Sequence, residues 1–322
     1  MNEFELIQTF FAKQARQRKD VILGIGDDAA LLRVPSDQVL VSTTDSFIAG
    51  VHFYADTAPR DIAHKALAVN LSDMAAMGGQ PAWILLNLIM PTANETWLKD
   101  FMHGFSNLSD CYQLQLVGGD TCCGPLTITI TLLGYVPINQ ALRRDTAQPG
   151  DKIFVTGYLG DAGLALQIIQ KKCLPVLTNT ELNYLYGRLQ HPQPRVEIGL
   201  ALRSLANSAI DLSDGLIADL SHILHASQVG AQIETHVLPL SSSLHKLPRK
   251  QALQLALTSG DDYELCFTVP KQKEMQLQKA FAQVHCPYTV IGLIRSEPGL
   301  RLCNKQGHDL LLDGHTGFQH FI

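Results

Sequence analysis

The chain has 322 residues, of which 46% are hydrophobic and 17% charged, as in soluble globular proteins with sizeable cores. This length favours two domains over one. The net charge of −5 argues against a nucleic-acid-binding surface, and no apolar run reaches the roughly 20 residues that a bilayer span requires.

The first half of the chain is predicted to alternate helices and strands. Four apolar side chains recur at helical spacing within residues 3–17 and predict a helix there. Strand-like segments follow at 21–26, 27–34 and 38–45, with a turn at 35–37. Helices are then expected at 61–77 and 95–112, and strands at 83–90, 114–119 and 127–136.

A polar stretch at 139–150, NQALRRDTAQPG, contains a Pro-Gly turn and interrupts this pattern. We place the domain boundary there, with domains at 1–138 and 149–322. Strands are predicted at 152–157, 231–238, 263–269, 288–294 and 300–304, and a strand, an acidic turn and a helix within 208–224. Further helices are expected at 163–169, after 195, at 251–257 and at 271–284. The predicted class is α+β, with both halves mixed.

The location of the protein is predicted from its cysteines and its first residues. The seven cysteines include no CxxC pair, which favours reduced thiols in a cytoplasmic protein. The segment MNEFELIQTFF lacks a basic region followed by a small-residue cleavage site, so no secretory signal is expected.

Seven aspartates lie beside glycine, serine, threonine or one another at the ends of predicted apolar runs. They are Asp27, Asp28, Asp45, Asp73, Asp120, Asp211 and Asp214. Their placement predicts one shared polyanionic site, in which like charges about 4 Å apart repel by roughly 4 kcal/mol at an effective dielectric near 20. Hard cations remove that repulsion, and Mg²⁺ held by carboxylates and substrate phosphates is the usual arrangement. The pattern indicates a Mg-nucleotide enzyme.

Simpler roles stay open for several of these acids. Asp73, on the predicted helix 61–77, could pair with Lys65 instead of binding a metal. Asp120 could cap its own turn, and either Ser213 or Asp214 could be the N-cap of the following helix.

The chain contains one familiar nucleotide-binding pattern and lacks two others. GIGDDA at 24–29 matches the dinucleotide fingerprint, with Asp45 near the place of a ribose-binding acid. That interpretation requires a crossover helix, whereas Pro35 and the strand expected near Val39 leave no room for one. No P-loop or kinase-type motif occurs, so phosphate is expected to be held by carboxylate-bound Mg²⁺ and by individual donors. The candidate donors are Thr43, Thr44, Arg144 and Ser213.

One segment and two single residues could each have either a functional or a purely structural role. The segment SGDDYELCF places Asp261, Asp262 and Glu264 before a strand, as a site for a substrate cation or as a polar loop. His52 could be a core histidine, and Phe318 a core aromatic.

Six segments in this order resemble the thiamine-monophosphate kinase family. They are GIGDDAAL, STTDSFIAGVHF, KALAVNLSDMAAMG, VGGDTCCGPLTITIT, NSAIDLSDGL and GDDYELCFTV, and they cover nearly the whole chain. The GDD, LSDMAAMG, GGDT and DLSDGL elements are shared with the wider superfamily of aminoimidazole ribonucleotide synthetase and selenophosphate synthetase. STTD with GVHF, and DYELCF, point more narrowly to the thiamine enzymes.

This resemblance implies an aminoimidazole ribonucleotide synthetase-like fold of two domains. The N-terminal domain would bind ATP and Mg²⁺ and form a barrel across a homodimer, and a mixed α/β C-terminal domain would complete the active site. The implied reaction is transfer of the ATP γ-phosphoryl group to thiamine monophosphate with several Mg²⁺ ions, without nucleic acid or membrane.

The resemblance also implies residue roles. Metal ligands would be Asp28, Thr44, Asp45, Asp73, Asp120, Asp211 and Asp214. ATP contacts would be Asp28, Thr43, Gly119, Arg144 and Ser213, and thiamine-phosphate contacts His52, Asp261 and Phe318. The family commonly has Glu where Asp261 stands, and Tyr or Trp at Phe318. No general base is assigned, because the acceptor is a phosphate oxygen of low pKa.

Three other functions stay open as alternatives. A sibling synthetase would use ATP with another acceptor, and a sensor would bind Mg-ATP without transfer. A nicotinamide-dependent oxidoreductase would change NAD(H) fluorescence on titration.

Overall fold

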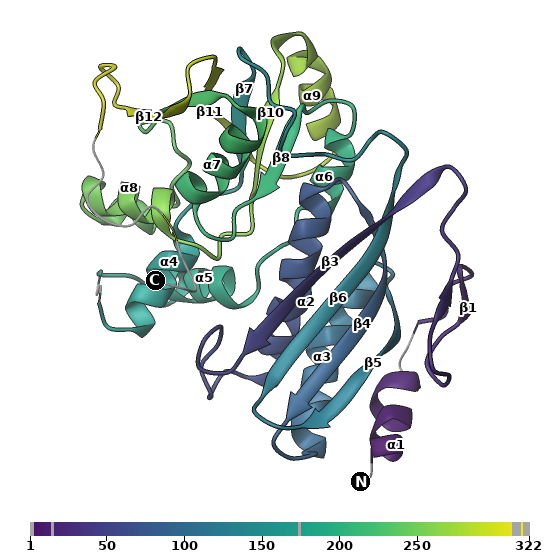
Figure 1. Cartoon of the computed structure of the whole chain (residues 1–322). Helices are drawn as coiled ribbons and strands as arrows, with labels where there is room; N and C mark the ends of the chain where they lie inside the picture. The colour runs from purple at the N-terminus through teal and green to yellow at the C-terminus, as the bar shows by residue number, and fades with distance from the viewer. Residues whose placement is uncertain (1–2, 14–15, 173–174, 311–316, 318–322) are drawn as a thin grey trace. The chain divides into compact units, whose positions relative to one another are not determined.

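The computed structural model describes residues 3–13, 16–172, 175–310 and 317 and divides the chain into two compact units (Figure 1). Unit 1 comprises Met1–Met74 and Gly79–Asn139, and unit 2 comprises Ala75–Gly78 and Gln140–Ile322. Both units mix helices with strands, which confirms the predicted α+β class. Among the described helices, none has both the length and the apolar character needed to cross a bilayer.

Unit 1 is built on a four-stranded sheet in the order β3-β6-β4-β5. The strands are β3 (Gln38–Ile48), β4 (Gln80–Met90), β5 (Gln115–Cys123) and β6 (Thr127–Pro137), and only β4 and β5 run parallel. In its described residues this sheet is open and does not close on itself as a barrel.

The two faces of this sheet differ because side chains alternate along each strand. In β6, Ile128 and Ile130 are fully buried, whereas the intervening Thr129 is partly exposed. The buried face is covered by α2 (Pro59–Ala76) and α3 (Glu95–Cys111) (Figure 1). Helix α3 begins where the Asn94 side chain accepts the Trp97 N–H. We call the opposite face, which carries the threonines, the open face.

A short hairpin packs on one end of the open face. It joins β1 (Val21–Leu23) to β2 (Leu31–Leu32), and its partly buried Val21 and Leu32 contact the cluster of Ala82, Trp83 and Val117. The predicted helix over residues 3–17 is wrong in its extent. Helix α1 (Glu3–Leu6) continues as a π-helical segment only to Ala12, with Phe10 and Phe11 buried, and residues 14–15 lie outside the described residues.

Unit 2 is built on a six-stranded sheet in the order β12-β9-β11-β7-β10-β8. The strands are β7 (Lys152–Thr156), β8 (Ser208–Asp211), β9 (Gly230–Glu234), β10 (Leu265–Val269), β11 (Tyr288–Arg295) and β12 (Gly299–Cys303). Only the edge pair of β12 with β9 is parallel. The central strands come from segments far apart in the chain, since β10 pairs with both β7 and β8.

Helices cover both faces of this second sheet. The helices are α4 (Asp161–Ile169), α5 (Asn179–Gln190), α6 (Val196–Leu202), α7 (Leu216–Ser227), α8 (Arg249–Thr258) and α9 (Glu274–Phe281), with short 3-10 turns at Leu244–Lys246 and Lys271–Lys273. The larger core joins apolar side chains of α4, α5, α7 and α8 to Ile153, Ile210 and Ile233. On the other face, Phe281 of α9 packs with Phe267 and Tyr288.

Helix α5 was absent from the sequence-based prediction. Thr178 accepts the Glu181 N–H, and the Glu181 carboxylate accepts the Thr178 N–H in return, so the helix begins with a complete capping box. This Thr-x-x-Glu pattern is legible in the sequence and would have located the helix start.

Candidate active site

Asp45 of β3 and Asp73 of α2 come together on the helix-covered face of unit 1. Asp45 stands opposite Ile130 in the sheet, in the buried row, and α2 brings Asp73 onto the same face. Burial, followed by the charge of Asp73 and a hydrogen bond with it, raises the pKa of Asp45 to about 6. Two adjacent acids in a poorly solvated place can hold either a proton or a cation.

Thr43 completes this group of oxygen atoms. Its hydroxyl donates to the Asp73 carboxylate, with Oγ1 and Oδ2 2.5 Å apart. Thr43 and Asp45 are two residues apart on one strand, so both side chains point to the same face. Three oxygen-bearing side chains from β3 and α2 therefore meet at one place.

Thr44 and Asp120 lie on the open face. Thr44 lies between Thr43 and Asp45 in the strand, so its side chain points the opposite way, where its Oγ1 is 3.0 Å from that of Thr131. Asp120 stands opposite Asn87 in a row that continues through Thr129. Unit 1 thus joins Asp45 to Asp73 but places Thr44 and Asp120 on the other side of the sheet.

The predicted strand ends at Asp45 and Asp120 are wrong. Strand β3 continues to Ile48 and β5 to Cys123, so both acids lie inside strands. The exposed Asp120 carboxylate accepts the Thr121 N–H at 2.8 Å and the Cys122 thiol at 3.1 Å. It therefore bonds its own strand, as the turn-cap alternative expected, but from within the strand.

Gly119 is required by the backbone. Its φ of 147° favours glycine, and a Cβ there would collide with the carbonyl group of Leu86. The glycine therefore allows β4 and β5 to pair closely just before Asp120.

The other predicted residues of unit 1 lie in loops. Asp28 is exposed between β1 and β2, and its N–H donates to the Asp27 carboxylate at 2.9 Å. His52 lies in the turn after β3, stacked on Phe47 at 5.3 Å between ring centroids. Its Nδ1 accepts the Ile48 N–H at 3.0 Å, which directs Nε2 away from this bond.

Asp211, Ser213 and Asp214 lie on the turn between β8 and α7 in unit 2. Asp211 ends β8 and is 3% exposed, whereas Ser213 and Asp214 are half-buried. The N-cap of α7 is Gly215 with no side-chain cap, so neither Ser213 nor Asp214 has the predicted capping role.

Asp219 holds this turn and was missed in the sequence. Its carboxylate, on the first turn of α7, accepts the N–H groups of Asp214 at 3.1 Å and Gly215 at 3.0 Å. Burial raises the pKa of Asp219 to about 7 against the lowering effect of these backbone bonds. The signal in the sequence was an acid, Asp219, placed about one helical turn after Ser213-Asp214-Gly215, where a carboxylate can reach back to the N–H groups of the turn.

The segment at 260–264 is fastened to the same turn. Asp261 N–H donates to the Ser213 carbonyl at 2.9 Å, and Tyr263 N–H donates to the Leu212 carbonyl at 2.8 Å. In return, the Leu212 N–H donates to the Glu264 carbonyl at 2.8 Å. Unit 2 therefore brings Asp261 next to Ser213, which the sequence did not reveal.

Asp262 and Glu264, grouped with Asp261 in the sequence, turn out to be inward-facing structural acids. Glu264 is fully buried and bonds Arg195 through both guanidinium Nε and Nη2 at 2.6 Å, with Arg188 at 3.0 Å. Asp262 accepts the Gly160 N–H, and burial raises its pKa well above the ordinary value. Of the three acids predicted to bind a substrate cation, Asp261 therefore stays the candidate.

Arg143 and Arg144 are adjacent but differ in their partners. Arg143 forms a two-pronged ion pair with Asp145, through Nε at 2.8 Å and Nη2 at 2.5 Å. The Arg144 side chain is exposed, and its carbonyl accepts the Ser227 hydroxyl. Arg144 is thus the better placed of the two to meet an anionic ligand. Phe318 lies outside the described residues.

No group of three or more His, Cys, Asp or Glu side chains gathers into a metal site among the residues that the structure describes. The seven predicted metal ligands are divided, with Asp28, Thr44, Asp45, Asp73 and Asp120 in unit 1 and Asp211 and Asp214 in unit 2. The pair of Asp45 and Asp73 fits a hard cation by the chemistry of its oxygen donors.

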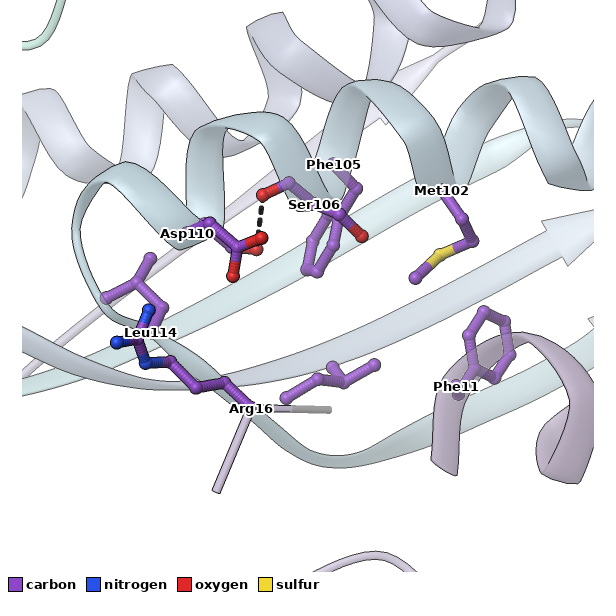
Figure 2. A pocket seen from close by; sticks show the side chains of 9 residues that line it. Phe11, Arg16, Met102, Phe105, Ser106, Asp110 and Leu114 are labelled. Carbon is purple, nitrogen blue, oxygen red and sulfur yellow. Dashed lines mark hydrogen bonds between the residues drawn. The ribbon is translucent and has the colours of Figure 1, made fainter. Parts of the chain in front are cut away.

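A small hollow in unit 1 lies apart from these residues. Phe11, Arg16, Met102, Phe105 and Asp110 contribute to its wall, and it has room for about one water molecule, near 10 Å³ (Figure 2). None of the predicted site residues lines it, and its size excludes a nucleotide.

Comparison with known proteins gives the family. Residues 26–136 match the N-terminal domain of AIR synthase related proteins, and residues 148–302 match their C-terminal domain. The thiamine-monophosphate kinase of Escherichia coli K12 is 47% identical over 320 residues, covering 99% of this chain and 98% of that protein.

Solved structures agree with this. The thiamine-monophosphate kinase of Stenotrophomonas maltophilia K279a has a TM-score of 0.87 and 44% identity, covering 94% of this chain and 96% of that one. AaThiL complexed with AMPPCP and TMP has a TM-score of 0.77 and 30% identity, covering 99% and 97% of the two chains. With near-complete coverage in both directions, this chain belongs to the thiamine-monophosphate kinase family of AIR synthase related proteins.

Proposed function

We propose that this protein transfers the γ-phosphoryl group of ATP to thiamine monophosphate, giving thiamine diphosphate and ADP as the last step of thiamine diphosphate synthesis. The observation that carries the proposal is full-length similarity at 47% identity to a thiamine-monophosphate kinase. The AaThiL complex with AMPPCP and TMP supports both substrates, because AMPPCP is an ATP analogue.

Several Mg²⁺ ions are part of this proposal. Their ligands would be Asp28, Thr44, Asp45, Asp73, Asp120, Asp211 and Asp214. The raised pKa of Asp45 beside Asp73 supports a cation at that pair, since a divalent ion removes the repulsion between the two carboxylates. When bound, Mg²⁺ supplies charge neutralisation for the two phosphorylated substrates.

The protein's own residues would hold and orient ATP. The proposed contacts are Asp28, Thr43, Gly119, Arg144 and Ser213. The exposed guanidinium of Arg144 suits a phosphate oxygen. Gly119 has no side chain that could obstruct a ligand beside the strand. The Asp219 carboxylate accepts the N–H groups of Asp214 and Gly215 and so holds the turn that carries Ser213.

Thiamine monophosphate would be bound by His52, Asp261 and Phe318. Asp261 is the half-exposed acid of its turn and suits the cationic thiazolium ring. The ring of His52 is fixed by Phe47 and by the Ile48 N–H, so that Nε2 is the atom able to meet a phosphate.

No side chain is needed as a general base. The acceptor is a phosphate oxygen whose second pKa is about 6, so it is largely ionised at neutral pH. Phosphoryl transfer then depends on alignment of two anionic groups and on neutralisation of their charge. Asp45, Asp73 and the donors above serve those two purposes.

The domain roles and the assembly are also proposed. Residues 1–138 would carry ATP, Mg²⁺ and dimer contacts, and residues 149–322 the remaining active-site groups of a cytoplasmic enzyme that binds neither nucleic acid nor membrane. Exposed apolar side chains support a homodimer with a shared barrel. Leu40 and Ile48 on the open face of β3 are 54% and 40% exposed, and Ile22 in the hairpin is 59% exposed.

One assay tests the function. The protein is incubated with ATP and thiamine monophosphate, with and without Mg²⁺, and thiamine diphosphate is quantified by fluorescence after oxidation. Product is expected only with Mg²⁺, and full activity in excess chelator would remove the metal proposal. ADP release with aminoimidazole precursors, and none with thiamine monophosphate, would assign the sibling reaction instead.

A further inference from the structure

The turn that carries Asp261 has an unusual backbone. Asp261 and Tyr263 have φ angles of 67° and 47°, in the left-handed region that residues with a Cβ rarely adopt. Such a conformation persists only where the surroundings impose it. The contacts of the neighbouring residues Asp262 and Glu264 impose it here.

The two residues that alternate with them point inward. Asp262 is 2% exposed and accepts the Gly160 N–H at 2.8 Å. Glu264 is 0% exposed and accepts the Thr156 hydroxyl at 2.6 Å, and Gly157 stands so close that a Cβ there would collide with its carboxylate. Asp261 is partly exposed, so it is the acid of this turn that a ligand can reach.

Two arginines from separate elements grip the inner end of this turn. Arg195, just before α6, forms a fork with both oxygens of Glu264, and Arg188 of α5 contacts the same carboxylate. Arg188 also donates to the carbonyls of Asp262 at 3.2 Å and Tyr158 at 3.3 Å. A buried carboxylate of this kind is held only while such partners are present.

We propose that Arg188 and Arg195 are positioning residues for thiamine monophosphate, which hold the turn at 260–264 through Glu264 and so present Asp261 to the cationic ring. The inference rests on the proposed function, in which Asp261 contacts this substrate. Both arginines act through Glu264, without contact with the substrate.

The effect is expected to be selective for one substrate. The adjoining turn with Ser213, a proposed ATP contact, has its own anchor in the two bonds from Asp214 and Gly215 to Asp219. Loosening Glu264 therefore frees Asp261 more than Ser213. If the arginines had a purely structural role, their loss would weaken the binding of both substrates equally or reduce the amount of folded enzyme.

The test compares full-length wild type with Arg195→Ala, Arg195→Lys and the control Arg249→Ala. Arg249 lies in the same unit and donates to the Thr235 carbonyl, away from this turn. We expect Arg195→Ala to raise KM for thiamine monophosphate about tenfold and to change KM for ATP by less than about twofold. Arg195→Lys should fall between, because an ammonium group keeps the charge but loses the fork.

Three results would overturn the proposal: an unchanged KM for thiamine monophosphate in folded Arg195→Ala, an equal rise for both substrates, or the same rise in Arg249→Ala. If Arg195→Ala does not fold, Arg195→Lys decides by the same ratio of KM values. Calorimetric binding of thiamine monophosphate to each variant gives a readout independent of turnover. A wild type that binds thiamine monophosphate but makes no thiamine diphosphate would refute the proposed function and leave the comparison of binding between variants intact.

Discussion

In unit 1, Asp45 and Asp73 bring two acids together, whereas in unit 2 Glu264 is buried between two arginines. Every influence on Asp45 raises its pKa, so its charged form is disfavoured in the absence of a cation. Glu264 has its counter-charges supplied by the protein. Acids near glycine and serine in the sequence can thus serve a ligand or serve the fold, and their partners in space decide which.

The largest expected effect is on stability, from Glu264→Ala. This change leaves Arg188 and Arg195, both largely buried, without their shared carboxylate, and it should reduce the free energy of unfolding by about 3–5 kcal/mol. Urea unfolding followed by circular dichroism measures it. Glu297→Ala, which removes an exposed partner of Arg295, should change stability little. Equal stability of the two variants would show that the network does not stabilise unit 2.

Asp45→Asn should show the opposite behaviour. Turnover of thiamine monophosphate should fall about 100-fold or more, because a carboxylate proposed to hold a charge-neutralising Mg²⁺ is lost. The metal-free variant should be as stable as wild type or more stable, since the repulsion with Asp73 is relieved. Asp56→Asn, an exposed aspartate of the same unit, is the control. Full turnover in Asp45→Asn would contradict a metal-binding role for this pair.

The pH dependence of stability separates the same two regions. The pKa of Asp45 is about 6 in the folded protein and 3.8 ordinarily, so between these values the folded state holds a proton that the unfolded chain has lost. Stability of the metal-free protein should therefore decrease as pH rises through this window, by at most about 3 kcal/mol, and level off above it.

The measurement is thermal unfolding between pH 4 and 7 in chelator, for wild type and Asp45→Asn. The difference between the two curves isolates Asp45 from Asp219, whose pKa of about 7 gives a slope of the same sign. Parallel curves would mean that the pair does not titrate as described. Glu264→Gln should leave this difference unchanged.

The smallest expected effect concerns the two neighbouring arginines. Arg144→Ala should raise KM for ATP about tenfold, because an exposed guanidinium able to bind phosphate is removed. Arg143→Ala should change it little, since Arg143 already binds Asp145. Initial-rate kinetics over a range of ATP concentrations gives both values. A larger effect at Arg143 would exchange their roles.

Local patterns predicted much of the fold. The alternation of threonine and isoleucine in 127–136 matches β6, and the predicted helix at 61–77 matches α2 within two residues at each end. The predictions failed where neighbours in space set the outcome. Strand β5 extends past Asp120 because β4 pairs with it as far as Cys123.

The candidate site was predicted by residue type but not by arrangement. Asp45 and Asp73 are joined only because α2 lies across the face of β3 to which Asp45 points. The division of Thr44 from Asp45 follows from strand alternation, which applies only once the strand is known to run through both.

The sequence by itself determined the class of the chain, the places where acids interrupt its apolar runs, and the family that those motifs resemble, because periodicity and local motifs are properties of neighbouring residues. Only the tertiary structure decided that Asp262 and Glu264 face inward to Gly160 and to two arginines, while Asp261, bonded to the Ser213 carbonyl, stays partly exposed. Charge partners of a buried acid come from elements distant in the chain, and no local pattern encodes which of the three acids in residues 261–264 they will meet.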